Sequence, residues 1–236
     1  MNKVFALVLF VVAVVKAQEV FPLNVHIKLG QSCASEAIRI NRLITSHDPN
    51  QQIDLIAQSE PHITMYLTSF YVKHEKEIYQ SLYKTLSNYK YDCVLQSNPR
   101  LNPGAPSNTY ALWDTNLPAC LQNLSDRIVN ATYPYIDENA KKQEPEWIEH
   151  LPEPTRSLKK KMIKEFGSPN VFSQFTPHIT VGHDDVTPDV FNALLAGPVA
   201  DANKCVVRIR QVSVGSVGKY GTVNRGKDKW TYKFNF

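Results

Sequence analysis

The stretch PHIT occurs twice in this chain, at Pro61–Thr64 within PHITMYLTSF and at Pro177–Thr180 within PHITVGH. The two histidines, His62 and His178, lie 116 positions apart. A four-letter repeat can arise by chance, so its context has to decide its meaning. In each copy the histidine and the threonine share one face of an extended strand, and apolar residues occupy the other face. We therefore predict two equivalent β-strands, each presenting a histidine and a threonine side by side.

The segments around the two motifs alternate between strands and helices. LNVHIKL (Leu23–Leu29) alternates apolar and polar residues, and so does KWTYKFNF at residues 229–236, as half-buried strands do. Apolar residues at helical spacing predict helices near residues 35–44, 74–88, 117–128, 158–166 and 187–197. Residues 137–157 are charged and rich in proline, which predicts an exposed linker. This order indicates an α+β or split β-α-β fold.

Residues 1–17 have the features of a secretory signal peptide. Lys3 precedes an apolar run, Val4–Val15, and the small residue Ala17 follows at a suitable cleavage position. The run is too short for a transmembrane helix. We expect a mature chain of residues 18–236 that is secreted, extracellular and not attached to a membrane. Its length suits one large domain or two closely packed lobes.

Cysteines and glycosylation sequons agree with export. An even number of cysteines in an oxidising compartment predicts two disulfides, for which three connectivities are possible. The cysteines are Cys33, Cys93, Cys120 and Cys205. None of them shows metal-ligand spacing such as C-x-x-C. Asn123 and Asn130 each begin an N-x-S/T sequon, so both are predicted glycosylation sites.

The charge of the chain is modest overall and uneven along its length. Without Lys3 and Lys16 the formal net charge falls from +4 to +2, which does not suit a protein that coats nucleic acid. Residues 204–233, however, hold eight lysines and arginines against the single acidic residue Asp228. This stretch could attract phosphate groups or could be the solvated face of a hairpin, and composition does not decide between the two.

Two histidines and two short hydroxyls on one surface suit phosphodiester chemistry. One imidazole can take a proton from the attacking oxygen while the other gives a proton to the leaving oxygen, because both titrate near neutral pH. The threonine hydroxyls can donate hydrogen bonds to the non-bridging phosphoryl oxygens. Such a reaction requires no metal or other cofactor, since positioning and charge stabilisation carry most of the work. The predicted catalytic residues are His62, Thr64, His178 and Thr180.

The sequence resembles the two-histidine (2H) phosphoesterase superfamily, which includes the bacterial 2′-5′ RNA ligase/cyclic phosphodiesterase group. The resemblance rests on two H-x-T-hydrophobic motifs, His62–Met65 and His178–Val181, about a hundred residues apart. It implies a bilobal α+β fold with two small antiparallel sheets, outer helices and pseudo-two-fold symmetry, in which the motif strands face each other across a central cleft. It also implies metal-independent hydrolysis of 2′,3′-cyclic, 2′-5′ or cyclic-nucleotide phosphodiester bonds. The signal peptide, cysteines and sequons depart from the intracellular members and leave the substrate open.

If the terminal and central segments form separate lobes, the disulfides should be Cys33–Cys205 and Cys93–Cys120. We expect the partner to be a nucleotide or a short RNA, bound by a monomer. The alternatives are a secreted protein that binds such ligands without turnover, and an unrelated secreted glycoprotein in which the repeat is fortuitous. Intact histidine and threonine in both motifs favour the enzyme, because a pure binding protein needs no matched acid and base.

Further residues are candidates for contacts with the substrate. By simple alternation Tyr66 shares the face of His62, and Tyr220 lies in a glycine-rich turn, so either ring could stack on a base. Lys219 in the same turn could attract phosphate. His183 could suggest a metal site together with His178 and the following aspartates, but simple alternation places it on the opposite face of the strand, and we predict no metal.

Overall fold

A computed structural model describes residues 18–90, 92–103 and 109–235. The predicted signal peptide and Phe236 lie outside the described residues. Within the described part of the chain, no helix is both long and apolar enough to span a membrane.

The predicted alternation of helices and strands is confirmed. The strands are β1 (Val20–Lys28), β2 (His62–Tyr71), β3 (Val94–Gln96), β4 (Asn102–Pro103), β5 (Tyr110–Asp114), β6 (His178–His183), β7 (Val206–Arg208), β8 (Gln211–Val217) and β9 (Val223–Lys233). The α-helices are α1 (Gln31–His47), α2 (Glu75–Ser87), α3 (Ala119–Thr132), α4 (Thr155–Phe166) and α5 (Pro188–Ala196). The fold class is α+β, as predicted.

Two small antiparallel sheets carry the two motifs. A four-stranded sheet has the order β2-β1-β8-β9, and a three-stranded sheet has the order β4-β5-β6. A two-stranded ribbon, β3-β7, accompanies them. Each motif forms the start of an outer strand of its sheet, β2 or β6, and these two strands pack against each other. The fold therefore brings the two histidine motifs together from opposite halves of the chain.

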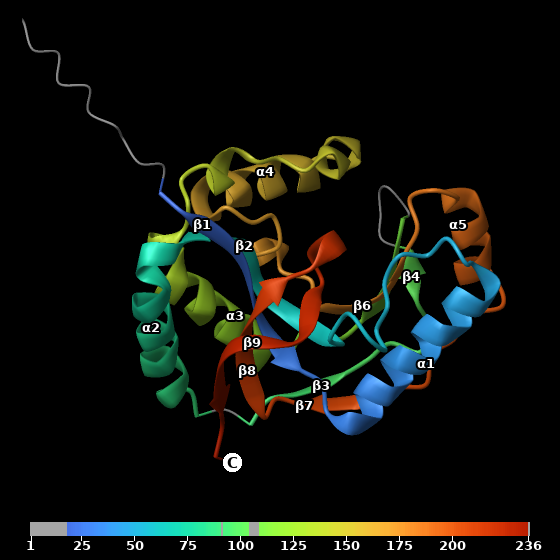
Figure 1. The fold of residues 1–236 in the computed structure, drawn as a ribbon, viewed down its shortest axis with the longest axis horizontal. Coiled ribbons are helices and arrows are strands. Elements are labelled where there is room, and N and C mark those ends of the chain that lie inside the picture. The colour runs from blue at the N-terminus through green and yellow to red at the C-terminus, as the bar shows by residue number, and fades with distance from the viewer. Residues whose placement is uncertain (1–17, 91, 104–108, 236) are drawn as a thin grey trace, which may run out of the picture.

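The helices cover the outer faces of the sheets (Figure 1). In this view α2 and α3 lie on the left, beside the four-stranded sheet, while α1 and α5 lie on the right. Helix α1 crosses to the other sheet: the Asn41 amide donates to the Val181 carbonyl of β6 at 2.9 Å, and Ile44 packs close to Gly182. The apolar faces of strands and helices merge into one buried core.

Both motif strands contain a β-bulge at the same position. In the β1–β2 pair His26 lies opposite Thr64 and Val25 opposite Tyr66, so Met65 has no partner. In the β5–β6 pair Leu112 lies opposite Thr180 and Ala111 opposite Gly182, so Val181 has no partner. The extra residue follows the threonine in both strands and reverses the facing of every residue beyond it. The repeat therefore extends from sequence to strand register.

The segment predicted to be an exposed linker is partly buried, so that prediction is wrong for its apolar positions. Two short 3-10 helices, Ala140–Lys142 and Glu146–His150, fold residues 137–157 back onto α4. Ile148 is fully buried and Ala140 is 5% exposed. Two apolar side chains suffice to anchor so short a stretch. Among so many charged residues they form no periodic pattern that the sequence could reveal.

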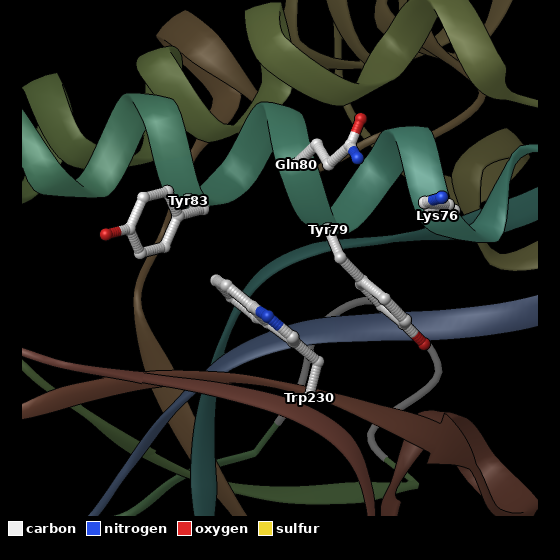
Figure 2. Close-up of a pocket in the computed structure, with 5 residues that line it drawn as sticks. All are labelled: Lys76, Tyr79, Gln80, Tyr83 and Trp230. Atoms are coloured by element: carbon white, nitrogen blue, oxygen red, sulfur yellow. The ribbon is translucent and has the colours of Figure 1, made fainter.

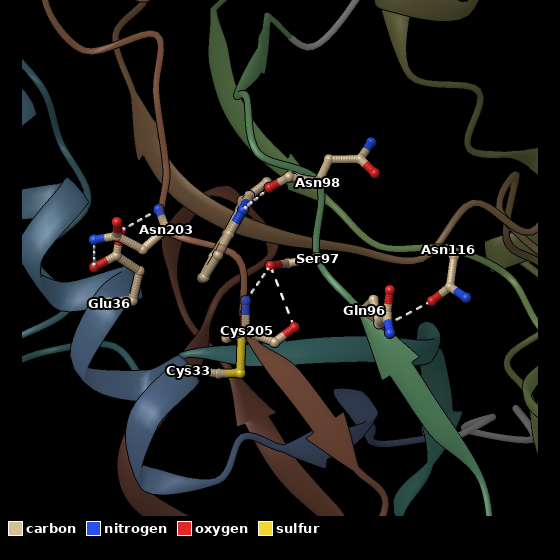
Figure 3. Close-up of a disulfide and its surroundings, with 9 residues drawn as sticks. Cys33, Glu36, Gln96, Ser97, Asn98, Asn116, Asn203 and Cys205 are labelled. Atoms are coloured by element: carbon tan, nitrogen blue, oxygen red, sulfur yellow. Dashed lines mark hydrogen bonds between the residues drawn. A yellow bond between two sulfur atoms is a disulfide. The ribbon is translucent and has the colours of Figure 1, made fainter.

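The predicted disulfide pairing is confirmed. Cys33 at the start of α1 bonds to Cys205, and Cys93 bonds to Cys120 in α3. Figure 3 shows polar contacts around the first bridge: Ser97 Oγ accepts from the Cys205 amide at 2.9 Å, and the Glu36 carboxylate accepts from the Asn203 amide at 2.8 Å. The bridge thus fastens the N-terminal end of α1 to the segment that leads into β7.

The two predicted sequon asparagines, Asn123 and Asn130, lie on the exposed face of α3, two helical turns apart. The hydroxyl residues of the same sequons, Ser125 and Thr132, are fully buried. Both asparagine side chains are thus open to solvent, and glycosylation there stays a prediction.

Candidate active site

The two motif histidines have the same orientation. His62 Nδ1 lies 2.6 Å from the Glu60 carbonyl and His178 Nδ1 lies 2.9 Å from the Thr176 carbonyl, in each case two residues earlier in the chain. A carbonyl only accepts hydrogen bonds, so Nδ1 must carry the proton in both rings. In the neutral imidazoles Nε2 then holds the free lone pair. Each histidine is therefore fixed in the tautomer that can take or return a proton at Nε2.

Asn24 of β1 links His62 to Thr64. Its side-chain amide lies 3.3 Å from His62 Nε2 and donates to Thr64 Oγ1 at 2.9 Å. Thr64 Oγ1 also lies 3.2 Å from His62 Nε2. Because Asn24 occupies one lone pair of the Thr64 hydroxyl, the hydroxyl hydrogen stays available for donation. Without substrate it can donate to His62 Nε2, and with a phosphoryl oxygen nearby it can turn toward that oxygen.

A third histidine lies beside His62. His26 of β1 is fully buried, and its ring packs edge to face against His62 with centroids 5.4 Å apart. Burial, followed by the charge of His26, lowers the pKa of His62 to about 3, although the bond to Glu60 opposes the shift. The charge of His178 lowers the pKa of His62 further, which places the two motif imidazoles within electrostatic reach of each other. His62 is therefore neutral at physiological pH.

Acidic and basic side chains form a network behind His26. Lys28 Nζ lies 2.8 Å from Asp228 and 3.8 Å from Glu60, and His26 Nε2 lies 3.5 Å from Asp228. Although burial raises the pKa of Asp228, hydrogen bonds with His26 and Lys28 outweigh it and lower this pKa to about 2. Arg225 pairs with Glu60 at 3.6 Å. These partners leave Lys28 and Arg225 largely neutralised.

His178 has a different cross-strand neighbour from His62. Its cross-strand partner is Asp114, whereas the cross-strand partner of His62 is Lys28. Burial lowers the pKa of His178, while its bond to Thr176 and the Asp114 carboxylate raise it. The asymmetry favours a neutral His62 and a more readily protonated His178.

Lys159 of α4 is a cation near His178. Its charge contributes to lowering the pKa of His178, and burial lowers its own pKa to about 8. Its ammonium donates to the Pro169 and Gln174 carbonyls at 3.5 Å and lies over the Trp147 ring at 5.9 Å. The ion pairs found among the described residues do not include Lys159. Its charge is thus uncompensated by a carboxylate.

The prediction that Tyr66 shares the face of His62 is wrong. The bulge at Met65 turns Tyr66 away from the histidine face, where it is 1% exposed and donates to the Phe166 carbonyl at 2.6 Å. With Thr68, which donates to the Gly167 carbonyl, it holds the end of α4. Gly167 has φ +66°, and a Cβ there would lie 2.8 Å from Thr68 Oγ1, so this contact requires glycine.

The corresponding bulge places His183 on the face of His178, which corrects the assumption of opposite facing. His183 lies opposite Tyr110, and its ring contacts Tyr110 at 4.3 Å and stacks on Tyr220 at 4.0 Å with an interplanar angle of 21°. His183 Nδ1 lies 2.6 Å from Gln52 Oε1. No cluster of three or more histidine, cysteine or acidic side chains within the described ranges is placed to hold a metal.

The turn between β8 and β9 places the side chains of Tyr220 and Lys219 in different surroundings. Tyr220 has φ +57°, and the turn closes by a bond from the Gly218 amide to the Thr222 carbonyl. The Tyr220 ring bridges from the four-stranded sheet to His183 of the three-stranded sheet. Lys219 lines a separate cavity of about 120 Å³. Base stacking by Tyr220 and phosphate binding by Lys219 stay predictions.

Two buried carboxyls, Asp48 and Asp184, lie beyond His183. They are 1% and 0% exposed, and they hydrogen-bond to each other. Burial, then the charge of Asp184, raises the pKa of Asp48, whereas bonds from Thr187 and neighbouring amides, opposed by burial, lower the pKa of Asp184. Of the two carboxyls, Asp48 is therefore the one that binds a shared proton more readily.

We expect Asp48→Asn to stabilise the protein at neutral pH. A raised pKa in the folded state contributes stability below the unfolded value, and this contribution is lost as the pH rises through the folded value. The amide keeps the bond to Asp184 without a second charge, so urea unfolding at pH 7 should show a gain of about 0.5–1.5 kcal/mol. The gain should shrink toward pH 4. An equal effect at both pH values would contradict the shared proton.

Several residues of the site were not identified as such from the sequence. Asn24, His26 and Lys28 were expected on one polar strand face, but nothing in the sequence paired that strand with the PHIT strand. Asp114 and Lys159 come from distant segments and carry no local signal. Only strand pairing and the position of α4 bring these side chains to the two histidines.

The fold matches solved structures of low sequence identity. E. coli LigT in complex with NADP+ superimposes with a TM-score of 0.53 at 12% identity, covering 92% of this chain and 99% of LigT. TT0787 of Thermus thermophilus gives 0.55 at 12% identity, covering 90% and 97%. A structure described as a phosphoesterase gives 0.50 at 11% identity, covering 92% and 100%. The sequence matches no protein-family model and no curated protein.

These comparisons show the fold. The chain has the LigT-like fold over nearly its whole described length, and nearly the whole of each matched structure is covered. LigT itself has also been solved with ATP and with 3′-AMP.

Proposed function

We infer that this chain is a two-histidine phosphoesterase, and we propose that it is a secreted, metal-independent phosphodiesterase acting on 2′,3′-cyclic, 2′-5′ or cyclic-nucleotide bonds. The LigT-like fold and the nucleotides bound to LigT support a nucleotide substrate. One observation carries the proposal: two histidines on packed strands have the same tautomer but different surroundings, since the buried His26 packs against His62 and Asp114 lies opposite His178. A matched base and acid arise from this difference.

In the proposed reaction His62 is the general base and His178 the general acid. The lone pair on His62 Nε2 takes a proton from the attacking water as its oxygen bonds to phosphorus. His178, protonated beside Asp114, gives its Nε2 proton to the leaving oxygen as the P–O bond breaks. The products are a phosphomonoester and a free hydroxyl, and the next cycle begins when His62 returns its proton to solvent and His178 regains one.

The remaining groups stabilise charge on the phosphoryl oxygens. The Thr64 hydroxyl, held by Asn24, is free to donate its hydrogen to one non-bridging oxygen. Thr180 has the equivalent position in β6, and we assign it the same role for the other oxygen. Lys159 supplies a positive charge on the side of His178, where negative charge develops on the leaving group.

A substrate screen tests the proposal. Purified mature protein is incubated with 2′,3′-cyclic mononucleotides, cyclic dinucleotides and 2′-5′ oligoadenylate, and products are scored by mass. Hydrolysis of one class identifies the substrate. Tight binding without turnover would instead support the alternative, a secreted nucleotide-binding protein that retains the site. Two histidines of the same tautomer, of which His178 lies across from the Asp114 carboxylate, favour turnover.

We expect kcat/KM to follow a bell-shaped pH profile with an acidic optimum. The lower limb reports His62, whose pKa is about 3, and the upper limb reports His178, whose pKa lies below its ordinary value. Asp114→Asn should move the upper limb to lower pH, because the carboxylate raises the pKa of His178. His26→Gln should move the lower limb to higher pH, because the charge of His26 lowers the pKa of His62. A profile unchanged in both variants would contradict this electrostatic account.

Activity should survive removal of divalent metals. In the proposed mechanism the two imidazoles perform both proton transfers, and no step requires a metal-bound water. Exhaustive dialysis against EDTA should therefore leave kcat/KM within about twofold of the starting value, with elemental analysis as a control. Loss of activity, with rescue by a single divalent ion, would overturn the metal-independent mechanism and make His183 and the adjacent Asp184 candidate ligands.

A further inference from the structure

An aromatic groove lies between α2 and β9, outside the two-histidine site (Figure 2). Its volume is about 280 Å³, and it is lined by Lys76, Tyr79, Gln80 and Tyr83 of α2 and by Trp230 of β9. We name it the α2–β9 groove. Three aromatic rings, one amide and one ammonium thus border one open hollow.

The rings of the groove form a stacking surface. Tyr79 and Trp230 are parallel within 3°, with centroids 5.9 Å apart, and in Figure 2 the indole lies between the two tyrosine rings. Tyr83 is 60% exposed. Trp230 projects from β9, the edge strand of its sheet, and is partly buried against Tyr79 of α2. Aromatic side chains at a surface, here the exposed Tyr83 beside the partly buried Tyr79 and Trp230, are what single-strand readers offer to nucleobases.

The charge beside the groove suits a polyanion. Lys76 lines the groove and occurs in none of the ion pairs found among the described residues, whereas Lys229 pairs with Glu75 at 3.3 Å. Lys76 therefore places a positive charge beside the aromatic rings that line the groove, and such a charge can hold a backbone phosphate while bases stack.

A β-bulge ties the groove to the two-histidine site. Gly215 of β8 lies opposite Asp228 and Val214 lies opposite Trp230, so Lys229 has no partner. The bulge lets Asp228 face His26 and Lys28 while Trp230, two residues later, faces α2. The groove and the network around His26 therefore lie on opposite faces of the four-stranded sheet, and a ligand that occupies both the groove and the two-histidine site passes around the β9 edge.

We propose that the α2–β9 groove is a stacking platform for the bases of a single-stranded oligonucleotide, so that the preferred substrate is an oligonucleotide with the reactive phosphodiester at its end. This inference rests on the proposed phosphodiesterase function. The rings hold the bases, Lys76 holds a backbone phosphate, and the end of the strand reaches His62 and His178.

The kinetic test compares two substrates with the same reactive end. One is a 2′,3′-cyclic mononucleotide, and the other is an oligoribonucleotide of about eight nucleotides, within the range of one single-strand site, that ends in the same cyclic phosphate. The wild-type kcat/KM should be higher for the oligonucleotide. Tyr83→Ala and Trp230→Ala should each lower that value by about 5- to 100-fold, the effect of losing one stacked base. The value for the mononucleotide should not change.

A matched pair of lysine variants tests the charge. Lys76→Gln should weaken the oligonucleotide reaction and reduce its salt dependence by about one unit of slope. Lys161→Gln is the control, because Lys161 is 61% exposed on α4 and lies outside both sites. Equal kcat/KM for the two substrates, or equal losses on both substrates in the variants, would overturn the platform.

A binding measurement separates this inference from the proposed function. Fluorescence anisotropy of a labelled 2′-deoxyoligonucleotide of the same length reports the platform without turnover. Binding that is weakened in Tyr83→Ala supports the groove even if no phosphodiester is hydrolysed. Mononucleotide turnover without any oligonucleotide binding supports the proposed function and overturns the groove. Binding of a neutral oligosaccharide or a peptide in place of the oligonucleotide would overturn it as well.

Discussion

Replacing either His62 or His178 by alanine is expected to lower kcat about 10²- to 10⁴-fold, the usual contribution of a positioned proton-transfer group. Each ring presents Nε2 because a backbone carbonyl fixes the proton on Nδ1, so neither variant leaves a substitute in place. The double variant should be little worse than either single variant, because both groups act on one transition state. Rates are measured on the substrate identified by the screen, and circular dichroism verifies the fold.

The two histidines should differ on an activated substrate. A leaving group of low pKa needs no general acid, so His178→Ala should recover most of its activity while His62→Ala should not. Recovery of His62→Ala instead would reverse the assignment of base and acid. Near-full turnover of either variant on the ordinary substrate would reject two-histidine catalysis altogether.

The threonines provide a graded comparison in the same assay. Thr64→Ala and Thr180→Ala each remove one hydrogen bond to a phosphoryl oxygen and should cost about 10- to 10³-fold in kcat. Serine at either position keeps the hydroxyl and should restore most of the rate. Equal losses in the alanine and serine variants would indicate that packing, and not hydrogen bonding, is what the threonines supply.

Removing the Cys33–Cys205 disulfide is expected to lower the free energy of unfolding by about 5 kcal/mol, because it closes a loop of 172 residues in the unfolded chain. The bridge also holds α1 to the segment before β7, where the contacts of Glu36 and Ser97 depend on its position. Urea unfolding of the Cys33→Ala/Cys205→Ala protein measures the loss, which is a large share of the stability of a typical domain.

The second disulfide is the matched control. Cys93–Cys120 closes a loop of only 27 residues, so its removal should cost about 3.5 kcal/mol in the same entropic model. A larger loss for the Cys93→Ala/Cys120→Ala protein would show that loop entropy does not control the ranking. Four alkylatable thiols in the native protein would contradict both bridges.

Much of the fold was predictable because the decisive patterns are local. Apolar side chains are buried on one face of a helix or strand. This burial produces the helical periodicity of α2 and α4 and the alternation of β1 and β9. The prediction of an exposed linker at residues 137–157 was wrong because it relied on the same kind of local pattern. Ile148 and Ala140 are too isolated among charged residues to form a periodic pattern, yet the folded domain buries them.

The sequence predicted the two histidines of the candidate site, but not which residues surround them. The H-x-T motifs identified His62 and His178, but the bulges after the threonines are decided by strand pairing, and they reverse the facing of Tyr66 and His183. Simple alternation fails at such a point because one extra residue exchanges the two faces of a strand. Simple alternation placed His183 on the opposite face from His178, but in the structure both side chains lie on the same face of β6. Tyr66, expected on the face of His62, instead supports the end of α4.

By itself the sequence determined the side chains available to this protein: two histidines and two threonines in matching strand motifs, an α+β order of elements, and four cysteines for which three pairings were possible. Only the tertiary structure decided how the two histidines differ. The buried His26 lies beside His62, and Asp114 lies opposite His178, through strand pairing across long sequence separations. The pKa of an imidazole depends on burial and on nearby charge, and both are properties of the folded chain. In the proposed mechanism, identical motifs therefore become a base and an acid only after folding.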